Sequence, residues 1–99
     1  MNSPTRPVSP EEQSATALIE VTVLAFARAR EALGQSRLTL AVPADSTVDD
    51  CLDEIARRYP AIAAMREGLL LAVNETYAGG HTRLRAGDTV GLIPPVSGG

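Results

Sequence analysis

Residues 47–60 read TVDDCLDEIARRYP and contain the most clearly specified element of this 99-residue chain. Apolar side chains recur there at helical spacing, at Val48, Cys51, Leu52, Ile55 and Tyr59. This period predicts an amphipathic helix over residues 48–59 with one apolar face. Thr47 and Asp50 form the Ser/Thr-x-x-Asp/Glu pattern of a capped start, and Pro60 is expected to end the helix.

Strand patterns precede this helix. Residues 18–26, LIEVTVLAF, predict a central strand, and residues 37–42, RLTLAV, alternate strictly up to Pro43. Between them, residues 27–33 are helix formers followed by Gly34, which suits the left-handed residue that closes a helix. The connection is too short for a long crossover, so the two strands are expected to pair antiparallel.

Strand patterns also follow the helix, at residues 69–73, 76–78 and 89–93, with turn residues between them. A strand pair, a long amphipathic helix and then further strands indicate an α+β fold whose helix packs on one face of a sheet. Residues 1–16, rich in Pro, Ser, Thr and Glu, are predicted to be a flexible extension of a single domain over residues 17–93. Residues 94–99 form a C-terminal tail.

Composition excludes several classes of function. Apolar residues make up 44% and charged residues 21%, which is ordinary globular balance. A net charge of −3 leaves no basic surface for nucleic acid. No apolar run is long enough to span a membrane, and no secretory signal pattern precedes the first strand. With one cysteine and therefore no internal disulfide, the expected location is the cytoplasm.

Side chains suited to catalysis are scarce. His81, the single histidine, lies in a predicted turn without a companion ligand, and Cys51 is expected to be core. A group of acids surrounds the helix start, at Asp45, Asp49, Asp50, Asp53 and Glu54. We expect these acids to form a capped, solvated face rather than a metal site. Asp53 with Arg57 and Glu54 with Arg58 are expected to form ion pairs four residues apart.

The last six residues are the remaining candidate site. Pro94 and Pro95 keep the root of the tail extended, Val96 and Ser97 are small, and Gly98 and Gly99 add no side chain at the tip. Such a tail reaches about 20 Å at roughly 3.3–3.6 Å per residue, enough to enter a partner's pocket. The terminal carboxylate is ionised at neutral pH and can attack an electrophilic phosphate that a partner supplies.

Four stretches, in this order, carry a family resemblance: VTVLAFARARE (21–31), STVDDCLDEI (46–55), LLLAVNETY (69–77) and LRAGDTVGLIPPVSGG (84–99). They resemble the small, sulfur-carrier subunits of molybdopterin synthase, which are ubiquitin-like β-grasp proteins with a mixed sheet and a protruding tail. The closing Pro-Pro-Val-Ser-Gly-Gly is the most specific part. Residues before 18 have no counterpart in the family pattern.

The resemblance implies a reaction cycle in which each step takes place on a partner protein. An E1-like adenylating enzyme would use ATP and magnesium to activate the carboxylate of Gly99, and a sulfur donor protein would convert it to a thiocarboxylate. The tail would then enter the large subunit of molybdopterin synthase, in a heterotetramer, and give its sulfur to cyclic pyranopterin monophosphate. Catalytic side chains are expected on the partners, and no bound cofactor or metal is expected on this chain. Whether this chain is itself an enzyme stays open.

The family's partner surface beside the tail maps to Phe26, Tyr77 and Ile93, although Phe26 also suits a core position. Two alternatives within the fold remain, a thiamine-pathway sulfur carrier and a ubiquitin-like protein modifier or binding module. The absence of lysine from the chain disfavours a chain-building modifier, which needs amine acceptors on its own surface.

Overall fold

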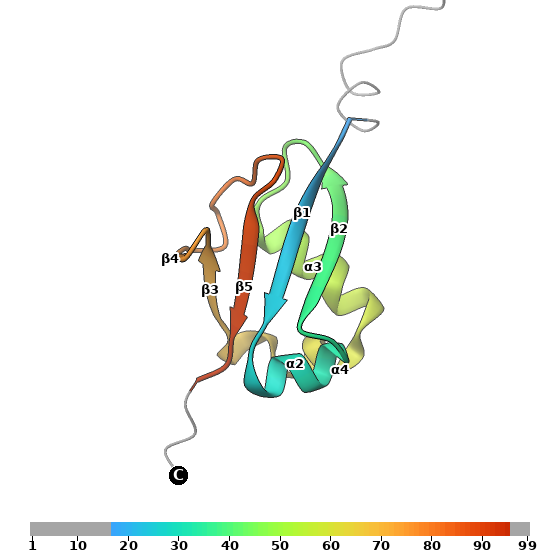
Figure 1. Ribbon diagram of the computed structural model, residues 1–99, viewed down its shortest axis with the longest axis vertical. Helices are drawn as coiled ribbons and strands as arrows, with labels where there is room; N and C mark the ends of the chain where they lie inside the picture. The colour runs from blue at the N-terminus through green and yellow to red at the C-terminus, as the bar shows by residue number, and fades with distance from the viewer. Residues whose placement is uncertain (1–16, 96–99) are drawn as a thin grey trace, which may run out of the picture.

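The computed structural model describes residues 17–95 as one mixed sheet with a layer of helices on one face (Figure 1). Strand β1 (Leu18–Ala25) lies inside the sheet, antiparallel to β2 (Arg37–Pro43) and parallel to β5 (Thr89–Ile93). Strand β5 pairs on its other side with β3 (Leu70–Val73), and β3 with the short β4 (Thr76–Tyr77). The resulting order, β2-β1-β5-β3-β4, confirms the α+β class and the central position of the first strand.

Helix α3 (Val48–Arg58) lies across the back of the sheet in Figure 1. Its start is the capping box expected from sequence: the Thr47 hydroxyl accepts from the Asp50 N–H at 3.2 Å, and the Asp50 carboxylate accepts from the Thr47 N–H at 3.0 Å. Helix α2 (Ala27–Leu33) ends at Gly34, whose φ of 81° is the expected left-handed conformation. These caps fix where both helices begin and end.

The helical layer extends past the point where the sequence predicted it to stop. Pro60 does follow the end of α3, but it is also the first residue of a further helix, α4 (Pro60–Met65). Proline suits this position because its missing N–H has no partner in a first helical turn. A 3₁₀ turn, η1 (Arg66–Gly68), then leads into β3. The single long helix expected here is therefore an 11-residue helix followed by a second, shorter one.

Most side chains of the core come from α2, α3 and the inward faces of β1, β2 and β5. Its buried members are Val21, Val23, Ala25, Ala29, Leu33, Leu40, Val42, Val48, Cys51, Leu52, Ile55, Ile62, Leu84, Val90 and Leu92. The alternation predicted for residues 37–42 is confirmed, because Leu40 and Val42 are buried while Thr39 and Ala41 are exposed. Within residues 17–95 no helix has both the length and the apolarity to cross a membrane.

Ion pairs on α3 differ in part from the expected pattern. Glu54 pairs with Arg58 at 2.7 Å, as predicted, and also with Arg57. Asp53 does not pair with Arg57: it accepts from Arg66 of η1 at 2.6 Å. The i, i+4 prediction was wrong at Asp53 because Arg66, 13 residues away in sequence, is brought back to α3 by the turn into α4.

Candidate functional site

The candidate site begins where β5 ends. Ile93, its last residue, pairs with Leu70 of β3, and Pro94 and Pro95 continue beyond the sheet without secondary structure. In Figure 1 this segment leaves at the lower edge of the sheet, beside the end of β1. The proposed reactive residue Gly99 and its neighbours Val96, Ser97 and Gly98 lie outside the described residues, as does the predicted extension over residues 1–16.

The three predicted partner-binding residues lie on the sheet face that the helices leave uncovered. Phe26 is 47% exposed and Tyr77 71% exposed, and Ile93 is half-buried. Gly91 lies among them: a β-carbon there would be 3.7 Å from Phe26 Cε2 and 3.9 Å from Ile93 Cδ1. Tyr77 joins the same face through its pairing with Ala72, which in turn pairs with Gly91. Phe26 is therefore a surface residue.

Leu70 completes this surface and was missed by the sequence analysis. It is 49% exposed and lies opposite Ile93, so it shares the face of Phe26 and Tyr77. We call Phe26, Leu70, Tyr77 and Ile93 the apolar patch. The run of three leucines at residues 69–71 could have predicted an exposed leucine, because a strand that buries one face exposes alternate positions of such a run.

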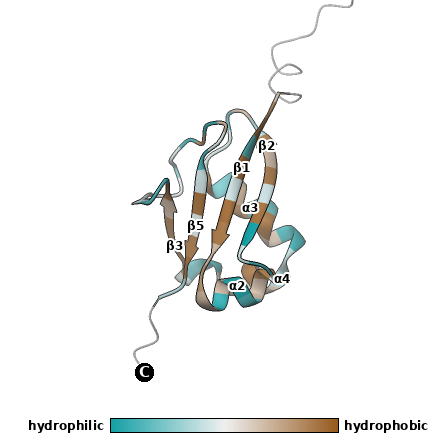
Figure 2. Ribbon diagram, in the orientation of Figure 1, coloured by the Kyte–Doolittle hydropathy of each residue, from teal (hydrophilic) through white to brown (hydrophobic). Residues whose placement is uncertain are grey.

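Hydrophobic residues colour β1 and β5 down to the end from which the C-terminal segment leaves (Figure 2). Clustered apolar side chains on an uncovered sheet face are typical of a surface that another protein covers. Aromatic side chains are the usual anchors of such interfaces, and two of the three in this chain lie here. Phe26, Leu70 and Ile93 thus lie close to the point where Pro94 leaves the sheet.

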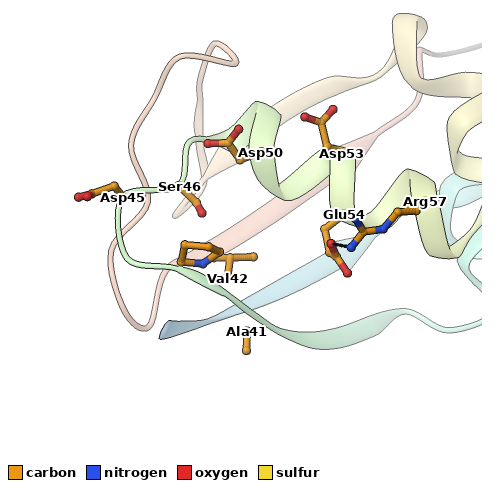
Figure 3. A pocket seen from close by; sticks show the side chains of 9 residues that line it. Ala41, Val42, Asp45, Ser46, Asp50, Asp53, Glu54 and Arg57 are labelled. Carbon is orange, nitrogen blue, oxygen red and sulfur yellow. Dashed lines mark hydrogen bonds and ion pairs between the residues drawn. The ribbon is translucent and has the colours of Figure 1, made fainter. Parts of the chain in front are cut away.

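The acidic residues form a different surface, between β2 and the start of α3. A pocket of about 440 Å³ there is lined by Asp45, Asp50, Asp53 and Glu54 together with Ala41, Val42, Pro43, Ser46 and Arg57 (Figure 3). Most of its carboxylates already have partners in the structure. Asp50 caps α3, Asp53 accepts from Arg66, and hydrogen bonds from Arg57 and Arg58 lower the pKa of Glu54 below its usual value.

The remaining candidate side chains do not join the site. Cys51 is completely buried, and burial, with a smaller contribution from Glu54, raises the pKa of its thiol to about 11. His81 is an exposed residue in the turn that precedes Thr82. Among residues 17–95 no three His, Cys, Asp or Glu side chains gather closely enough to hold a metal ion.

A mixed sheet whose last strand lies in the middle, parallel to the first, places the chain in the ubiquitin-like β-grasp class. The profile of the ThiS family matches residues 23–99. The molybdopterin synthase sulfur carrier subunit of Arabidopsis thaliana is 41% identical over 88 residues, 89% of this chain and 92% of that protein. The protein of the same name from Homo sapiens is 34% identical, over 83% of this chain and 97% of its own. The chain belongs to the ThiS family.

Solved structures agree with this assignment. SAMP1 from Haloferax volcanii superposes with a TM-score of 0.73 at 28% identity and covers 81% of this chain and 99% of its own. A putative molybdopterin converting factor, subunit 1, from Pyrococcus furiosus has a TM-score of 0.72 at 29% identity, over 79% and 99% of the two chains. The predicted fold is confirmed, and so is the family that the sequence resembles.

Proposed function

We propose that this chain is the sulfur-carrier subunit of a molybdopterin synthase and that the carboxylate of Gly99 is its reactive group. The observation that carries the proposal is 41% identity, across 89% of the chain, to a protein named for that role. The fold supports it, since β5 ends beside the apolar patch and leaves six residues, ending in Gly-Gly, to reach into a partner. The cytoplasm is the location that suits this role.

The chemistry needs an activated acyl group. A carboxylate oxygen of Gly99 would attack the α-phosphorus of ATP on an adenylating enzyme, with magnesium, and release pyrophosphate. A persulfide of a donor protein would then displace AMP and form an acyl disulfide. Attack of a thiol on the donor's sulfur would break this S–S bond, form a new disulfide on the donor and release the C-terminal thiocarboxylate. Activation is required because a bare carboxylate has no good leaving group. Glycines at positions 98 and 99 let both walls of an active site approach the acyl carbon closely.

The thiocarboxylate would next give its sulfur to cyclic pyranopterin monophosphate inside the large synthase subunit. The apolar patch supplies the docking surface for that subunit, and the tail supplies the reagent. In Helicobacter pylori a β-grasp protein of similar fold has been solved as a complex of subunits 1 and 2 of molybdopterin-converting factor. Catalytic side chains would belong to the large subunit, and this chain would position its own terminus.

Protein modification is the second candidate, favoured by the likeness to SAMP1, which is named a small archaeal modifier protein. The same activated Gly99 would then be transferred to an amine of a target. This chain has no lysine, so it cannot form chains with itself through side-chain amines. Recovery of Gly99 in an isopeptide bond to other proteins, with no thiocarboxylate, would favour this alternative over the carrier.

Intact mass spectrometry tests the carrier role. Incubation with an adenylating enzyme, ATP, magnesium and a sulfur donor should shift the mass by one oxygen-to-sulfur exchange. Variants that lack Gly99, or carry one residue beyond it, are the matched controls and should stay unchanged while keeping the fold. An unmodified wild-type chain beside an adenylating enzyme that modifies its own carrier would overturn the proposal.

The protein that the chain binds distinguishes a carrier for molybdopterin synthase from a carrier for the thiamine pathway. The chain with an affinity tag placed before residue 17 leaves the terminus free. Under this proposal it should retain the large synthase subunit rather than a thiazole-forming enzyme when both are offered at equal concentration. Retention of the thiazole-forming enzyme alone would assign the chain to the other pathway.

A further inference from the structure

The root of the C-terminal segment lies against one backbone position of η1. A β-carbon built on Gly68 would lie 3.9 Å from both Cδ and Cγ of Pro95, which is ordinary van der Waals contact. Gly68 has no positive φ, unlike Gly34 and Gly87, so its backbone conformation does not require glycine. A side chain at position 68 would therefore begin at contact distance from the ring of Pro95, and a γ-carbon directed toward the ring would have no room.

The turn that carries Gly68 is anchored to the helical layer. Arg66 Nη1 donates to Asp53 Oδ1 at 2.6 Å, and Arg66 Nη2 lies 3.4 Å from the backbone oxygen of Asp49. Leu69 N–H donates to Arg66 O at 3.2 Å and closes the turn. Two residues after Gly68, Leu70 pairs with Ile93, the residue before Pro94. Gly68 is thus fixed relative to α3 on one side and to the end of β5 on the other.

The two prolines border a cavity. It has a volume of about 570 Å³ and is lined by Pro94, Pro95 and Gly68 together with Arg28, Ala63, Ala64, Met65, Arg66, Glu67 and Leu69. The contact between position 68 and Pro95 therefore lies at the edge of open space, and it limits how far the prolines can shift relative to η1. Without this contact, the prolines have room to move into the cavity.

We infer that Gly68 is a positioning residue, whose bare backbone seats the Pro95 ring and so sets the direction in which the reactive terminus leaves the domain. The inference rests on the proposed function, because direction matters only if the tail must enter an active site. A carrier that docks through its apolar patch and reacts through its terminus needs a fixed angle between the two. Misplacement of a reacting group by about 1 Å costs up to 100-fold in rate.

The contact between position 68 and the Pro95 ring is first tested in the free protein. Nuclear Overhauser effects should connect the α-protons of Gly68 with the δ- and γ-protons of Pro95 in the wild-type chain. The corresponding effects should persist in Gly68→Ala, whose methyl group fits at contact distance. They should be lost in Gly68→Val, because two γ-carbons occupy two of the three staggered positions around the β-carbon. Their absence from the wild-type chain would overturn the inference whatever the protein does with sulfur.

The functional consequence is tested with thiocarboxylated chain and the large synthase subunit. For Gly68→Val we expect kcat for sulfur transfer to fall about tenfold or more, with KM within about twofold, because docking through the patch is unchanged. Gly68→Ala should retain the wild-type kcat. Ala61→Val adds the same two methyl groups to an exposed position of α4 and controls for the bulk.

A double variant connects the effect to the contact. Pro95→Gly removes the ring that a valine side chain at position 68 would obstruct. Adding Gly68→Val to Pro95→Gly should therefore cost little further rate, whereas it costs about tenfold alone. The inference would be overturned if Gly68→Val lowered kcat equally in the wild-type chain and in Pro95→Gly. It would also be overturned if Gly68→Val lost the Overhauser effects to Pro95 and still had the wild-type kcat. Failure of the wild-type chain to transfer sulfur at all would instead overturn the proposed function and leave the contact measurement standing.

Discussion

Asn74 joins two loops through both ends of its side-chain amide. Its Nδ2 donates to Asp88 Oδ1 at 3.0 Å, and its Oδ1 accepts from the Thr89 N–H at 3.0 Å. Asp88 in turn accepts from the Arg85 N–H at 2.8 Å. These bonds tie the β3–β4 turn to the start of β5, the strand that carries the tail. Asn74 and Asp88 lie in two of the stretches that carry the family resemblance, 69–77 and 84–99, and these hydrogen bonds join the two stretches.

Glu75, the next residue, occupies a conformation that suits glycine better. The β3–β4 turn has positive φ at both central residues, 51° at Asn74 and 71° at Glu75, as in the type I′ hairpin that favours Asn-Gly. Glu75→Gly should raise the free energy of unfolding by roughly 0.5–1 kcal/mol, because relief of left-handed strain exceeds the entropy that glycine adds to the unfolded chain. Urea denaturation measures it. The same change at Thr76, inside β4, should lower stability, and a lower urea midpoint for Glu75→Gly would contradict this account.

Cys51 should be chemically silent in the folded protein. Its thiol is buried, and burial raises its pKa to about 11 from a reference of 9.0, so at pH 8 only about one thiol in a thousand is ionised. Iodoacetamide at pH 8 should therefore label the chain in urea and leave the folded chain unlabelled. Stoichiometric labelling of the folded, unmodified chain would contradict the burial. A silent cysteine also lets the same reagent report a C-terminal thiocarboxylate without interference.

At the scale of elements, the capping box decides where α3 starts. Thr47→Ala removes the hydroxyl that accepts from Asp50 N–H and should cost about 1 kcal/mol in the free energy of unfolding. Thr47→Ser keeps the oxygen and is the matched control, with most of the stability retained. Equal stability of the alanine and serine variants in urea denaturation would show that the cap contributes nothing.

Local patterns were sufficient to predict most elements and insufficient to predict how they meet. The strands, α2 and the capped start of α3 follow from alternation, helical spacing and turn residues, which act over a few positions. Helix α4 was missed because Pro60 both ends one helix and suits the first position of the next. The Asp53–Arg66 pair depends on a chain reversal, which no local period encodes. Alternation within the leucine run could have predicted that one leucine is exposed, but the position of Leu70 opposite Ile93 depends on strand pairing.

The candidate site, too, could be predicted from the sequence only in part. The Gly-Gly terminus and the residues Phe26, Tyr77 and Ile93 could be named from the sequence because the family pattern contains them. The proximity of Gly68 and Pro95 could not, since these residues are 27 positions apart and are brought together by the β3–β5 pairing.

For the whole molecule, the important relation is between the apolar patch and the tail. Ile93 and its neighbours Phe26 and Leu70 lie where β5 ends and Pro94 begins (Figure 1). A partner that covers the patch therefore also covers the point from which the C-terminal segment leaves the sheet. Tyr77→Ala removes the most exposed aromatic anchor of the patch. We expect it to weaken binding to the large synthase subunit about tenfold, or about 1.4 kcal/mol, while the unfolding midpoint stays unchanged because Tyr77 is 71% exposed.

Leu18 offers the matched control for this prediction. It is 60% exposed and apolar, but it begins β1 at the opposite end of the sheet from the tail (Figure 1). Leu18→Ala should leave the affinity for the large subunit within about twofold if burial of the patch, rather than general surface hydrophobicity, drives docking. Titration calorimetry on both variants distinguishes docking through the patch from binding through general surface hydrophobicity. Equal losses of affinity would remove the patch from the binding surface, and wild-type affinity for Tyr77→Ala would place the docking energy elsewhere, in the tail itself.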